Sequence, residues 1–499
     1  MAGRLRRIVL RTRRWPGLEP LYRAYYAAAG LACAAGFSAA LGSGLRSLFL
    51  RRGLASGVCT PGVSDVDLLA VLDDGALSPD GLRSLWARHA ALKKVFPILG
   101  ELQVCSPRQL ELYAARGGRR AAELRSWRRL TGAPAPGAGP RSPASLVQES
   151  VSAYLSLLDA CARWAGGRTE DRFSAVKAFL DAVRCARASE AGAEPASRAE
   201  EIEEMRPRNP PALIACLEDP DLLDADLAFK LVHIALGVVD AVCPAIGSAE
   251  GGARARPEEA GEPVWARRLH SLTAPGLPPC GVFSDGLYRW YVVIEERPAP
   301  ESLERLLELI RSWTRGRDAL AAPGWLVTYR ILAVLCASPH LETPFFRESL
   351  GPAGAGAWRS GGRLRWNVDV TRLPQLEPAA RLALVRQAAA ELALSLPLFG
   401  QREWAGSGSY RLAYLCSRAL APAAWVRSRA ALDPSETRSV LAAFGEAFPE
   451  EASAIGALDK DLALDPRELD GRDPREAFYA HWPLLNRALT RAQEELEAA

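Results

Sequence analysis

One short segment, VDLLAVL (Val66–Leu72), constrains the fold of this chain more than any other. Successive residues of a strand point to opposite faces of its sheet, and LLAVL places apolar side chains on both faces. Such a strand is stable only where other layers cover both sides of the sheet. The segment therefore predicts a central, fully buried strand.

The remaining apolar patterns predict a mostly helical chain. Runs typical of strands occur in two patches, Leu45–Leu50, Val66–Leu72 and Leu99–Val104 in the first, and Tyr288–Ile294 and Ile331–Leu335 in the second. Apolar residues at spacings of three and four predict helices at Asp80–Phe96, Leu146–Trp164, Phe173–Ala188, Pro211–Val242 and Pro378–Leu394. We therefore expect an α+β fold in which a mixed sheet with helices is followed by a helical bundle.

Composition indicates a soluble, globular protein. Of the 499 residues, 49% are hydrophobic and 24% are charged, and the net charge of +4 favours no particular partner. The ten cysteines form no CxxC pair, which argues against a disulfide framework or a zinc site and favours reduced thiols in the cytoplasm. The sequence contains no P-loop, GxSxG, HExxH or Rossmann fingerprint.

The N-terminus combines a basic arm with an apolar segment. The arm, MAGRLRRIVLRTRR, is typical of a solvated tail, and the alternative is binding to nucleic acid or to an anionic lipid surface. Residues Ala24–Leu45 carry no charge, but they are mostly alanine and glycine, whose transfer into lipid is only weakly favourable. We expect a helix that packs on the next domain, without stable membrane insertion.

Two aspartates stand at the start of the buried strand. Asp65 and Asp67 lie two residues apart, so on an extended backbone both side chains project to the same side. Two carboxylates there repel each other unless a cation lies between them, and hard oxygen ligands suit Mg²⁺. The preceding turn, GLASG, has the backbone freedom and the N–H groups that can hold a triphosphate. Together these features indicate phosphoryl or nucleotidyl transfer.

The pattern R-G-L-A-S-G, five further residues and then V-S-D-V-D-L resembles the signature of the polymerase-beta-type nucleotidyltransferase superfamily, in particular its minimal bacterial and antibiotic-modifying members. The resemblance covers about Leu45 to Tyr113. It implies that Asp65 and Asp67 hold Mg²⁺ and that a third carboxylate on a later strand completes the catalytic and metal site. Glu101 is the candidate for this third carboxylate.

The same resemblance implies a nucleotide-binding turn, and here the sequence departs from the family. Arg52, Gly53, Ser56 and Gly57 would form the turn. Where the family has Gly-Ser, this chain has Arg52-Gly53, so the hydroxyl that normally contacts a phosphate is missing. Backbone N–H groups, Ser56 or a direct pairing of Arg52 with a phosphate are the possible replacements.

Each acid also has a structural interpretation. Asp65 and Asp67 could end a surface strand without a metal, and Glu101 could cap its strand beside Gly100. The pair Asp73–Asp74 follows the buried strand and is expected to form a turn.

The chain also contains an internal similarity. Val66–Leu92 aligns without gaps with Leu287–Trp313, and matching apolar positions on the helix predict that His89 lies on a buried face. LQVCSPRQLELY is then matched with AVLCASPHLETPFF. In this alignment the positions of Asp65, Asp67 and Glu101 are taken by Gly286, Tyr288 and Ala333. We infer one competent and one degenerate unit, each followed by helices; chance similarity of two βαβ-like segments is the alternative, and a different strand order would exclude the repeat.

These features predict six segments and one function. The segments are 1–43 (basic arm and helix), 44–130 (nucleotidyltransferase-like domain), 144–245 (helical domain), 246–265 (linker), 266–350 (degenerate unit) and 366–499 (C-terminal helical domain). The expected function is Mg²⁺-dependent transfer of a nucleoside monophosphate from an NTP to a hydroxyl of a small molecule, protein or RNA, with release of pyrophosphate. The alternative is a catalytically inactive protein of the same fold that senses a nucleotide or serves as an interaction scaffold.

Overall fold

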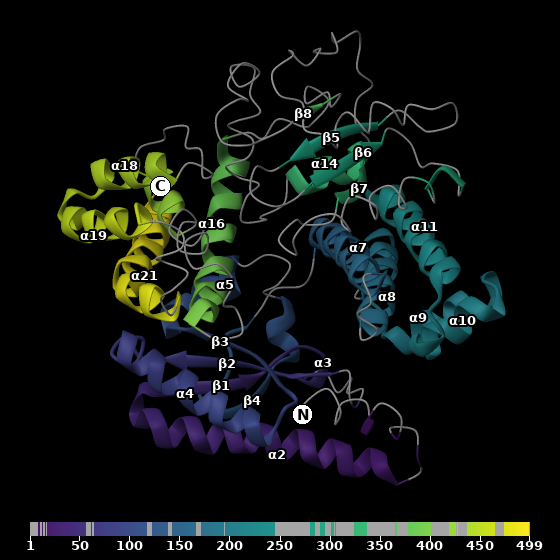
Figure 1. The fold of residues 1–499 in the computed structure, drawn as a ribbon, viewed down its shortest axis with the longest axis horizontal. Coiled ribbons are helices and arrows are strands. Elements are labelled where there is room, and N and C mark those ends of the chain that lie inside the picture. Colours follow the sequence, from purple (N-terminus) through teal and green to yellow (C-terminus); the bar gives the residue numbers. More distant parts are fainter. Residues whose placement is uncertain are drawn as a thin grey trace. The chain divides into compact units, whose positions relative to one another are not determined.

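The computed structural model of the chain describes residues 8–9, 12, 15, 17–55, 61, 64–116, 122–137, 142–165, 171–193, 195–244, 280–284, 290–294, 301–303, 305, 324–336, 365–366, 378–400, 419–425, 427, 437–464 and 474–498 (Figure 1). The chain divides into two compact units. Unit 1 combines Met1–Pro140 with Leu382–Ala499, and unit 2 is Arg141–Arg381. The C-terminal helices therefore belong to the same unit as the first sheet, although they are far from it in sequence.

Unit 1 contains a four-stranded mixed sheet in the order β3-β2-β1-β4. Its strands are β1 (Leu45–Leu50), β2 (Val66–Leu72), β3 (Leu99–Cys105) and β4 (Arg128–Gly132). β1 is antiparallel to β2 and to β4, whereas β2 and β3 are parallel. Every residue of β2 except Asp67 is buried, which confirms the prediction of a central strand covered on both faces.

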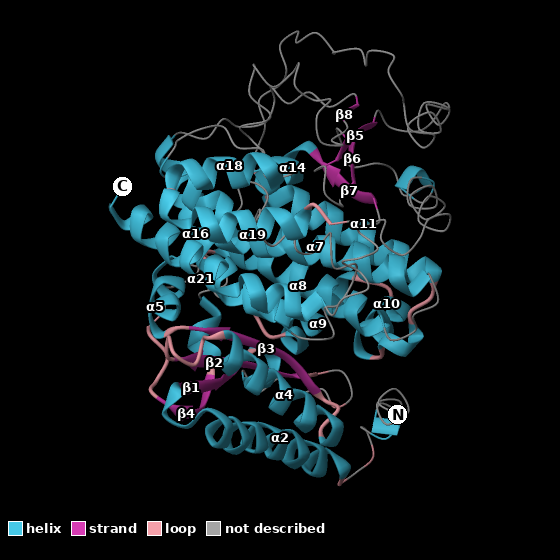
Figure 2. Ribbon diagram, turned by 60° about the vertical axis from the view of Figure 1, so that its left-hand side comes forward, coloured by secondary structure: helices cyan, strands magenta, loops and turns pink. Residues whose placement is uncertain are grey.

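Helices from the N-terminal part of the chain cover one face of this sheet. α2 (Leu18–Leu41) packs against α4 (Pro79–Val95) and against β1 and β2 (Figure 2). α4 begins where the Ser78 side chain accepts a hydrogen bond from the Gly81 N–H, with Pro79 in the first turn, and it ends with two lysines that favour the helix C-terminus. The short elements nearby are η1 (Gly42–Gly44), α3 (Arg52–Ala55) and η2 (Ala122–Ser126).

α2 is the one described helix that is long and apolar enough, by length and composition, to cross a membrane. The segment Leu18–Gly44 meets this criterion with 28% of its tested window buried, and a core helix or an N-terminal signal sequence would meet it too. In unit 1 this helix buries Tyr26, Ala29, Cys33 and Phe37, which agrees with the expected packing on the next domain.

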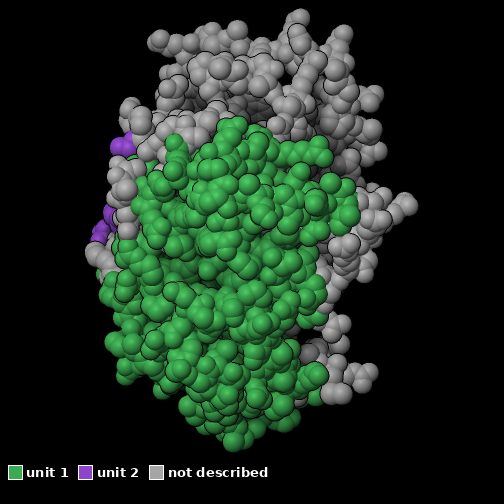
Figure 3. Space-filling model, turned by 90° about the vertical axis from the view of Figure 1, so that its left-hand side faces the viewer, with its two compact units in different colours: residues 1–140, 382–499 green, residues 141–381 purple. Residues whose placement is uncertain are grey.

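The opposite face of the sheet is covered by α5 (Pro107–Arg116) and by C-terminal elements. The C-terminal elements that contact the sheet are α16 (Pro378–Ser395) and η8 (Leu396–Gly400). The others are α18 (Thr437–Ala447), η10 (Pro449–Glu451), α19 (Ala452–Leu462) and α21 (Pro474–Ala498); the first three pack against one another, and α19 packs against α21. η8 packs against β3 and α4, and α21 packs against α4. Leu394 of α16 joins the core cluster that contains Phe49 and Leu69 of the sheet. Figure 3 shows this unit, N-terminal and C-terminal parts together, in green.

Polar contacts also tie the C-terminal helix α21 to the first part of the chain. Trp482 Nε1 donates to the Leu77 carbonyl oxygen at 2.5 Å, and Gln109 Nε2 donates to Asn486 Oδ1 at 3.2 Å. Trp482 is buried, so its hydrogen bond is protected from competition by water.

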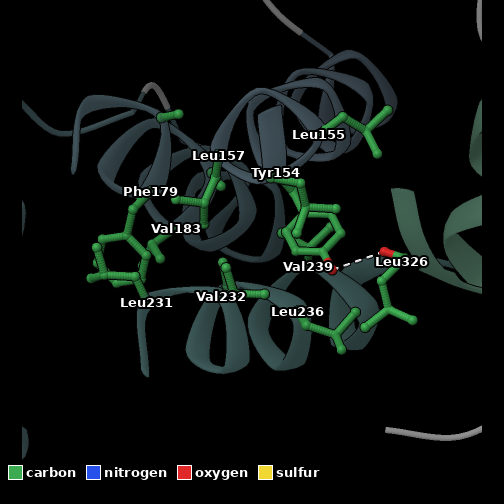
Figure 4. Close-up of a cluster of buried hydrophobic side chains, with 14 of the residues drawn as sticks. Tyr154, Leu155, Leu157, Phe179, Val183, Leu231, Val232, Leu236, Val239 and Leu326 are labelled. Carbon is green, nitrogen blue, oxygen red and sulfur yellow. Dashed lines mark hydrogen bonds between the residues drawn. The ribbon is translucent and has the colours of Figure 1, made fainter. Parts of the chain in front are cut away.

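Unit 2 begins with a bundle of helices: α7 (Pro143–Ala165), α8 (Asp171–Ala191), α9 (Arg198–Met205), η3 (Arg206–Arg208), α10 (Pro211–Glu218), η4 (Pro220–Leu222) and α11 (Ala225–Val242). Its core is formed by apolar side chains of α7, α8 and α11, among them Leu157, Phe179 and Leu231 (Figure 4). The prediction of one helix over Pro211–Val242 was wrong. Pro220 has no N–H to continue the helix, and Asp224 caps a new one by accepting from the Leu227 N–H at 2.8 Å.

The second sheet has the same topology as the first. Its strands are β5 (Cys280–Ser284), β6 (Trp290–Ile294), β7 (Gly324–Thr328) and β8 (Arg365–Trp366). They lie in the order β7-β6-β5-β8, with β5 antiparallel to β6 and β8, and β6 parallel to β7. Strand order, which could have excluded the internal repeat, is thus identical in the two sheets when β1–β4 are matched with β5–β8.

The predicted strand Ile331–Leu335 is wrong, because these residues lie in α14 (Tyr329–Cys336). A short apolar run fits a buried helix as well as a buried strand, and here the Thr328 hydroxyl caps the helix by accepting from the Ile331 N–H at 3.2 Å. The strand that occupies the position of β3 is β7, which ends before the helix. The match of Glu101 with Ala333 is therefore also wrong, because Ala333 lies in a helix.

The two sheets exchange their helical cover. In unit 2, α7 packs against β7 and α14, and the Tyr154 hydroxyl donates to the Leu326 carbonyl oxygen at 2.9 Å (Figure 4). In unit 1, α16 and η8 pack against the first sheet. α7 follows the first sheet in sequence and α16 follows the second. Each sheet is therefore covered by helices that follow the other sheet.

This exchange predicts how the chain behaves when it is cut. Fragments 1–250 and 251–499 each contain one sheet and the helices that cover the other, so each alone exposes apolar faces. We expect each fragment to aggregate when it is produced alone and the two to form a soluble one-to-one complex when they are produced together, as measured by size-exclusion chromatography. A soluble monomeric 1–250 fragment with cooperative thermal unfolding would contradict the exchange.

Candidate functional site

The β1–β2 pairing brings Arg51 opposite Asp67. Leu50 pairs with Leu68 in the antiparallel ladder, and the Arg51 N–H donates to the Asp67 carbonyl oxygen at 2.9 Å, one residue beyond the last strand pair. Residues that face each other across such a pair project to the same side of the sheet. Arg51 and Asp67 therefore lie on the side of Phe49 and Leu69, towards the core cluster that α5 and Leu394 share.

A bulge in the β2–β3 pairing gathers the acidic residues. Val66 pairs with Leu99 but Leu68 pairs with Leu102, so Gly100 and Glu101 together lie opposite Asp67. The Glu101 N–H donates to Asp67 Oδ1 at 3.0 Å. This hydrogen bond fixes the Asp67 carboxylate at the start of the two parallel strands and stabilises its negative charge.

Gly100 leaves room for both aspartates. A Cβ atom on Gly100 would lie 2.5 Å from Asp67 Oδ1 and 2.8 Å from Asp65 Cβ, which is closer than non-bonded atoms can approach. The side chains of Asp65 and Asp67 thus share the space above one glycine. Asp65 Cβ and Asp67 Oδ1 lie beside the same glycine, and the direction of the Asp65 carboxylate stays a prediction.

Glu101 is held by a neighbour on its own strand. Gln103 Nε2 donates to Glu101 Oε1 at 2.5 Å, and Gln103 is buried where it pairs with Leu69. Asp65 is exposed, whereas Asp67 and Glu101 are half-buried. The Glu101 backbone N–H therefore contacts Asp67, whereas the Glu101 carboxylate accepts a hydrogen bond from Gln103.

The donor set fits a divalent cation at two carboxylates. Asp67 Oδ1 and Asp65 Cβ lie next to Gly100, and Mg²⁺ is commonly held in proteins by one or two carboxylates and by the substrate phosphates. Among the described residues, no three or more His, Cys, Asp or Glu side chains are grouped so that all could hold one metal ion. Of the three predicted metal ligands, Asp65 and Asp67 thus lie beside the same glycine, and the backbone of Glu101 contacts Asp67.

The predicted nucleotide turn is described in part. Arg52 and Gly53 begin the four-residue helix α3, and Ser56 and Gly57 lie outside the described residues. The far end of the same segment is tied to α2, because the Tyr26 hydroxyl donates to the Ser64 carbonyl oxygen at 2.7 Å.

Arg51 was missed by the sequence analysis. It is 3% exposed, its Nη2 lies 3.9 Å from Glu123 Oε2, and its guanidinium lies 4.9 Å from the centre of the Trp127 ring. Among the residues that the structure describes, neither Nε nor Nη1 finds a hydrogen-bond partner. The period-two alternation from Phe49 was the signal that could have found it, because that alternation places residue 51, rather than Arg52, on the core side of the strand.

The remaining titratable residues near the sheet have structural roles. His89 is buried between the rings of Phe37 and Trp86, as predicted. Asp73 forms an ion pair with Arg46 and leads into the turn at 74–77, also as predicted. Burial raises the pKa of the Cys105 thiol to about 12, so this cysteine is a neutral core residue rather than a nucleophile or metal ligand.

No protein-family model, no curated protein and no solved structure matches the chain.

The crowding at Gly100 gives a direct test of this geometry. Gly100→Ala should push the Asp67 carboxylate away from the Glu101 N–H and lower the free energy of unfolding by about 1–3 kcal/mol, measured by urea denaturation. Gly75→Ala is the matched control, because a Cβ atom there would meet nothing within 4 Å. Equal stability of the two variants would show that the aspartates are not packed over Gly100.

Proposed function

We propose that the chain is a Mg²⁺-dependent nucleotidyltransferase of the polymerase-beta type. The observation that carries this proposal is the pair of aspartate side chains packed over Gly100 at the start of a fully buried strand. Carboxylate pairs of this kind commonly hold Mg²⁺ together with substrate phosphates, and this pair lies directly after the segment whose pattern resembles the triphosphate turn of that superfamily. The mixed sheet, with the turn between antiparallel β1 and β2 and the acids on parallel β2 and β3, supports the same assignment.

In this proposal each residue has a separate task. Asp65 and Asp67 hold Mg²⁺, which when bound offsets the negative charge of the phosphates. The backbone around Arg52, Gly53, Ser56 and Gly57 binds the triphosphate. Glu101, directed by Gln103, accepts the proton of the acceptor hydroxyl.

The reaction that these residues support is an in-line displacement. The acceptor oxygen forms a bond to the α-phosphorus, the bond between that phosphorus and the bridging oxygen breaks, and pyrophosphate leaves. The hydroxyl belongs to a small molecule, a protein or an RNA. Positioning and charge stabilisation supply most of the rate enhancement in such a mechanism.

The second sheet is, in this proposal, a degenerate copy. β2 ends at Leu72 and β6 ends at Ile294. The helix after β3 begins at Pro107, and the helix after β7 begins at Tyr329. The number of residues between the two copies is the same at both places, so one offset aligns them. By this offset, the positions of Asp65 and Asp67 are taken by Leu287 and Arg289, which corrects the match with Gly286 and Tyr288 in the gap-free alignment. The connection from β5 to β6 is only residues 285–289, which is too short for a turn like residues 51–65. We assign this copy a structural role.

A second candidate function is a nucleotide sensor without catalysis. It is favoured because, within the described part of the chain, two carboxylates rather than three are grouped at the site, and because Gly53 stands where the family has a serine. The same residues would then bind Mg²⁺ and nucleotide, and no transfer would follow.

Pyrophosphate release separates the two candidates. With Mg²⁺ and each α-labelled NTP, offered with RNA, protein and small-molecule fractions, we expect pyrophosphate release and a labelled acceptor. Asp67→Asn should reduce release by about 10²-fold or more, since charge stabilisation in the transition state is lost. Asp74→Asn, at an exposed aspartate of the following turn, is the control and should leave release unchanged.

Two other outcomes have defined meanings. Tight NTP binding that depends on Asp67, without release in any fraction, would assign the sensor function. Release that persists unchanged in Asp67→Asn would remove this site from the reaction and contradict the enzyme proposal.

A further inference from the structure

The polar side chains on the core side of the sheet have hydrogen-bonding capacity that the described residues do not use. Arg51 Nε and Nη1, Trp127 Nε1 and Gln103 Oε1 are buried atoms without a hydrogen-bond partner. All three residues are less than 10% exposed. Arg51 stands opposite Asp67, Gln103 pairs with Leu69, and the Arg51 guanidinium lies over the Trp127 ring, so the three share one side of the sheet.

Among these groups, an unpaired Arg51 side chain has the largest free-energy cost, because it is charged. A guanidinium stays charged at any physiological pH, and a buried charge without full hydrogen bonding is strongly destabilising. The Glu123 carboxylate lies 3.9 Å from Nη2, which is beyond hydrogen-bond distance, and the Trp127 ring, whose centre lies 4.9 Å from the guanidinium carbon, offers no lone pair to an N–H group. The described residues therefore leave two donors of a buried cation without a partner, which is the arrangement expected of a site that an anion completes.

The character of the unused atoms indicates the ligand. Three of the four, on Arg51 and Trp127, are donors, so the ligand must be rich in acceptor oxygens. Arg51 is also the residue directly before α3, the start of the predicted nucleotide turn. An oxyanion bound by Arg51 would thus lie at the entrance of that turn and next to the strand that carries Asp67.

We propose that Arg51 binds a phosphate group of the nucleotide and replaces the serine hydroxyl that this turn lacks. The assignment rests on the nucleotide site proposed above and adds a residue that the sequence pattern does not identify. Trp127 supports the guanidinium with its ring, and its indole N–H is available to a second oxygen of the same ligand. Free phosphate and pyrophosphate offer the same chemistry as a nucleotide, and the test separates them.

The test combines binding with stability. Isothermal titration would use inorganic phosphate, pyrophosphate and ATP as probes, each with and without Mg²⁺, on the full chain. Loss of a charged hydrogen bond predicts that Arg51→Met weakens pyrophosphate and ATP binding by about 10- to 100-fold. Arg51→Lys should also weaken both, because lysine lacks the planar guanidinium. Arg46→Met, on the same strand with an exposed side chain paired to Asp73, is the control and should bind as the wild type does.

Stability distinguishes a ligand site from a structural cation. Replacing a buried, incompletely paired charge by an apolar side chain of similar length is often neutral or stabilising. We therefore expect Arg51→Met, without ligand, to unfold at the same or a higher urea concentration than the wild type. A destabilised Arg51→Met together with unchanged pyrophosphate binding by Arg51→Lys would assign Arg51 a structural role and overturn the proposal.

The remaining outcomes separate this inference from the proposed reaction. Binding of pyrophosphate that depends on Arg51, in a protein that transfers no nucleotide, would support the anion site and reject the enzyme. Nucleotide transfer at the wild-type rate and affinity in Arg51→Met would keep the enzyme and overturn the role of Arg51. Binding of inorganic phosphate alone, with no affinity for pyrophosphate or ATP, would also overturn a nucleotide site.

Discussion

Two hydrogen bonds to Asp67 determine how the candidate site is built. The Arg51 N–H holds the carbonyl oxygen of Asp67, and the Glu101 N–H holds its carboxylate. The first contact prolongs the antiparallel pairing of β1 and β2, and the second exists because a bulge places two residues of β3 opposite one of β2. Gly100 then provides the space in which Asp65 joins Asp67. Asp67 is also the one residue of β2 that is not buried.

This local geometry depends on helices that are distant in sequence. The side of the sheet that carries Phe49 and Leu69 is closed by α5 and by Leu394 of α16, and η8 packs on β3. The second sheet, which has the same strand order, is covered by α7 in the corresponding way. Exchange of helices between two units of equal topology makes each unit dependent on the other half of the chain. The helices that follow the second sheet complete the cover of the first.

The sequence identifies β1, β2, β3 and β6 because their apolar signals are local, whereas β4, β5, β7 and β8 were not predicted. β1 and β2 have the predicted bounds, β3 is one residue longer, and the turn at Asp73 and the buried His89 are as predicted. Ile331–Leu335 was assigned to a strand because a short apolar run carries no period that distinguishes strand from helix, and the deciding hydrogen bond comes from the Thr328 side chain.

Other features need three-dimensional pairing and could not be read from local patterns. The bulge at Gly100 appears only when β2 and β3 are in register, and the helix exchange involves contacts across several hundred residues. Arg51 could be predicted in part. Strand alternation alone places its side chain on the core side of the sheet. The adjacent Arg52 was preferred because the family pattern was aligned on the turn, and the unpaired donors of Arg51 are visible only with the core around them.

The central claim is that Asp65 and Asp67 form a site that a divalent cation and a nucleotide occupy together. Electron paramagnetic resonance of Mn²⁺, used in place of Mg²⁺, measures this directly as the fraction of bound metal with and without α,β-methylene-ATP, an NTP analogue that cannot be cleaved at the α-phosphorus. The account predicts that the analogue strengthens Mn²⁺ binding and that Asp67→Asn abolishes the effect. Mn²⁺ binding that is indifferent to the analogue, or that survives unchanged in Asp67→Asn, would contradict it.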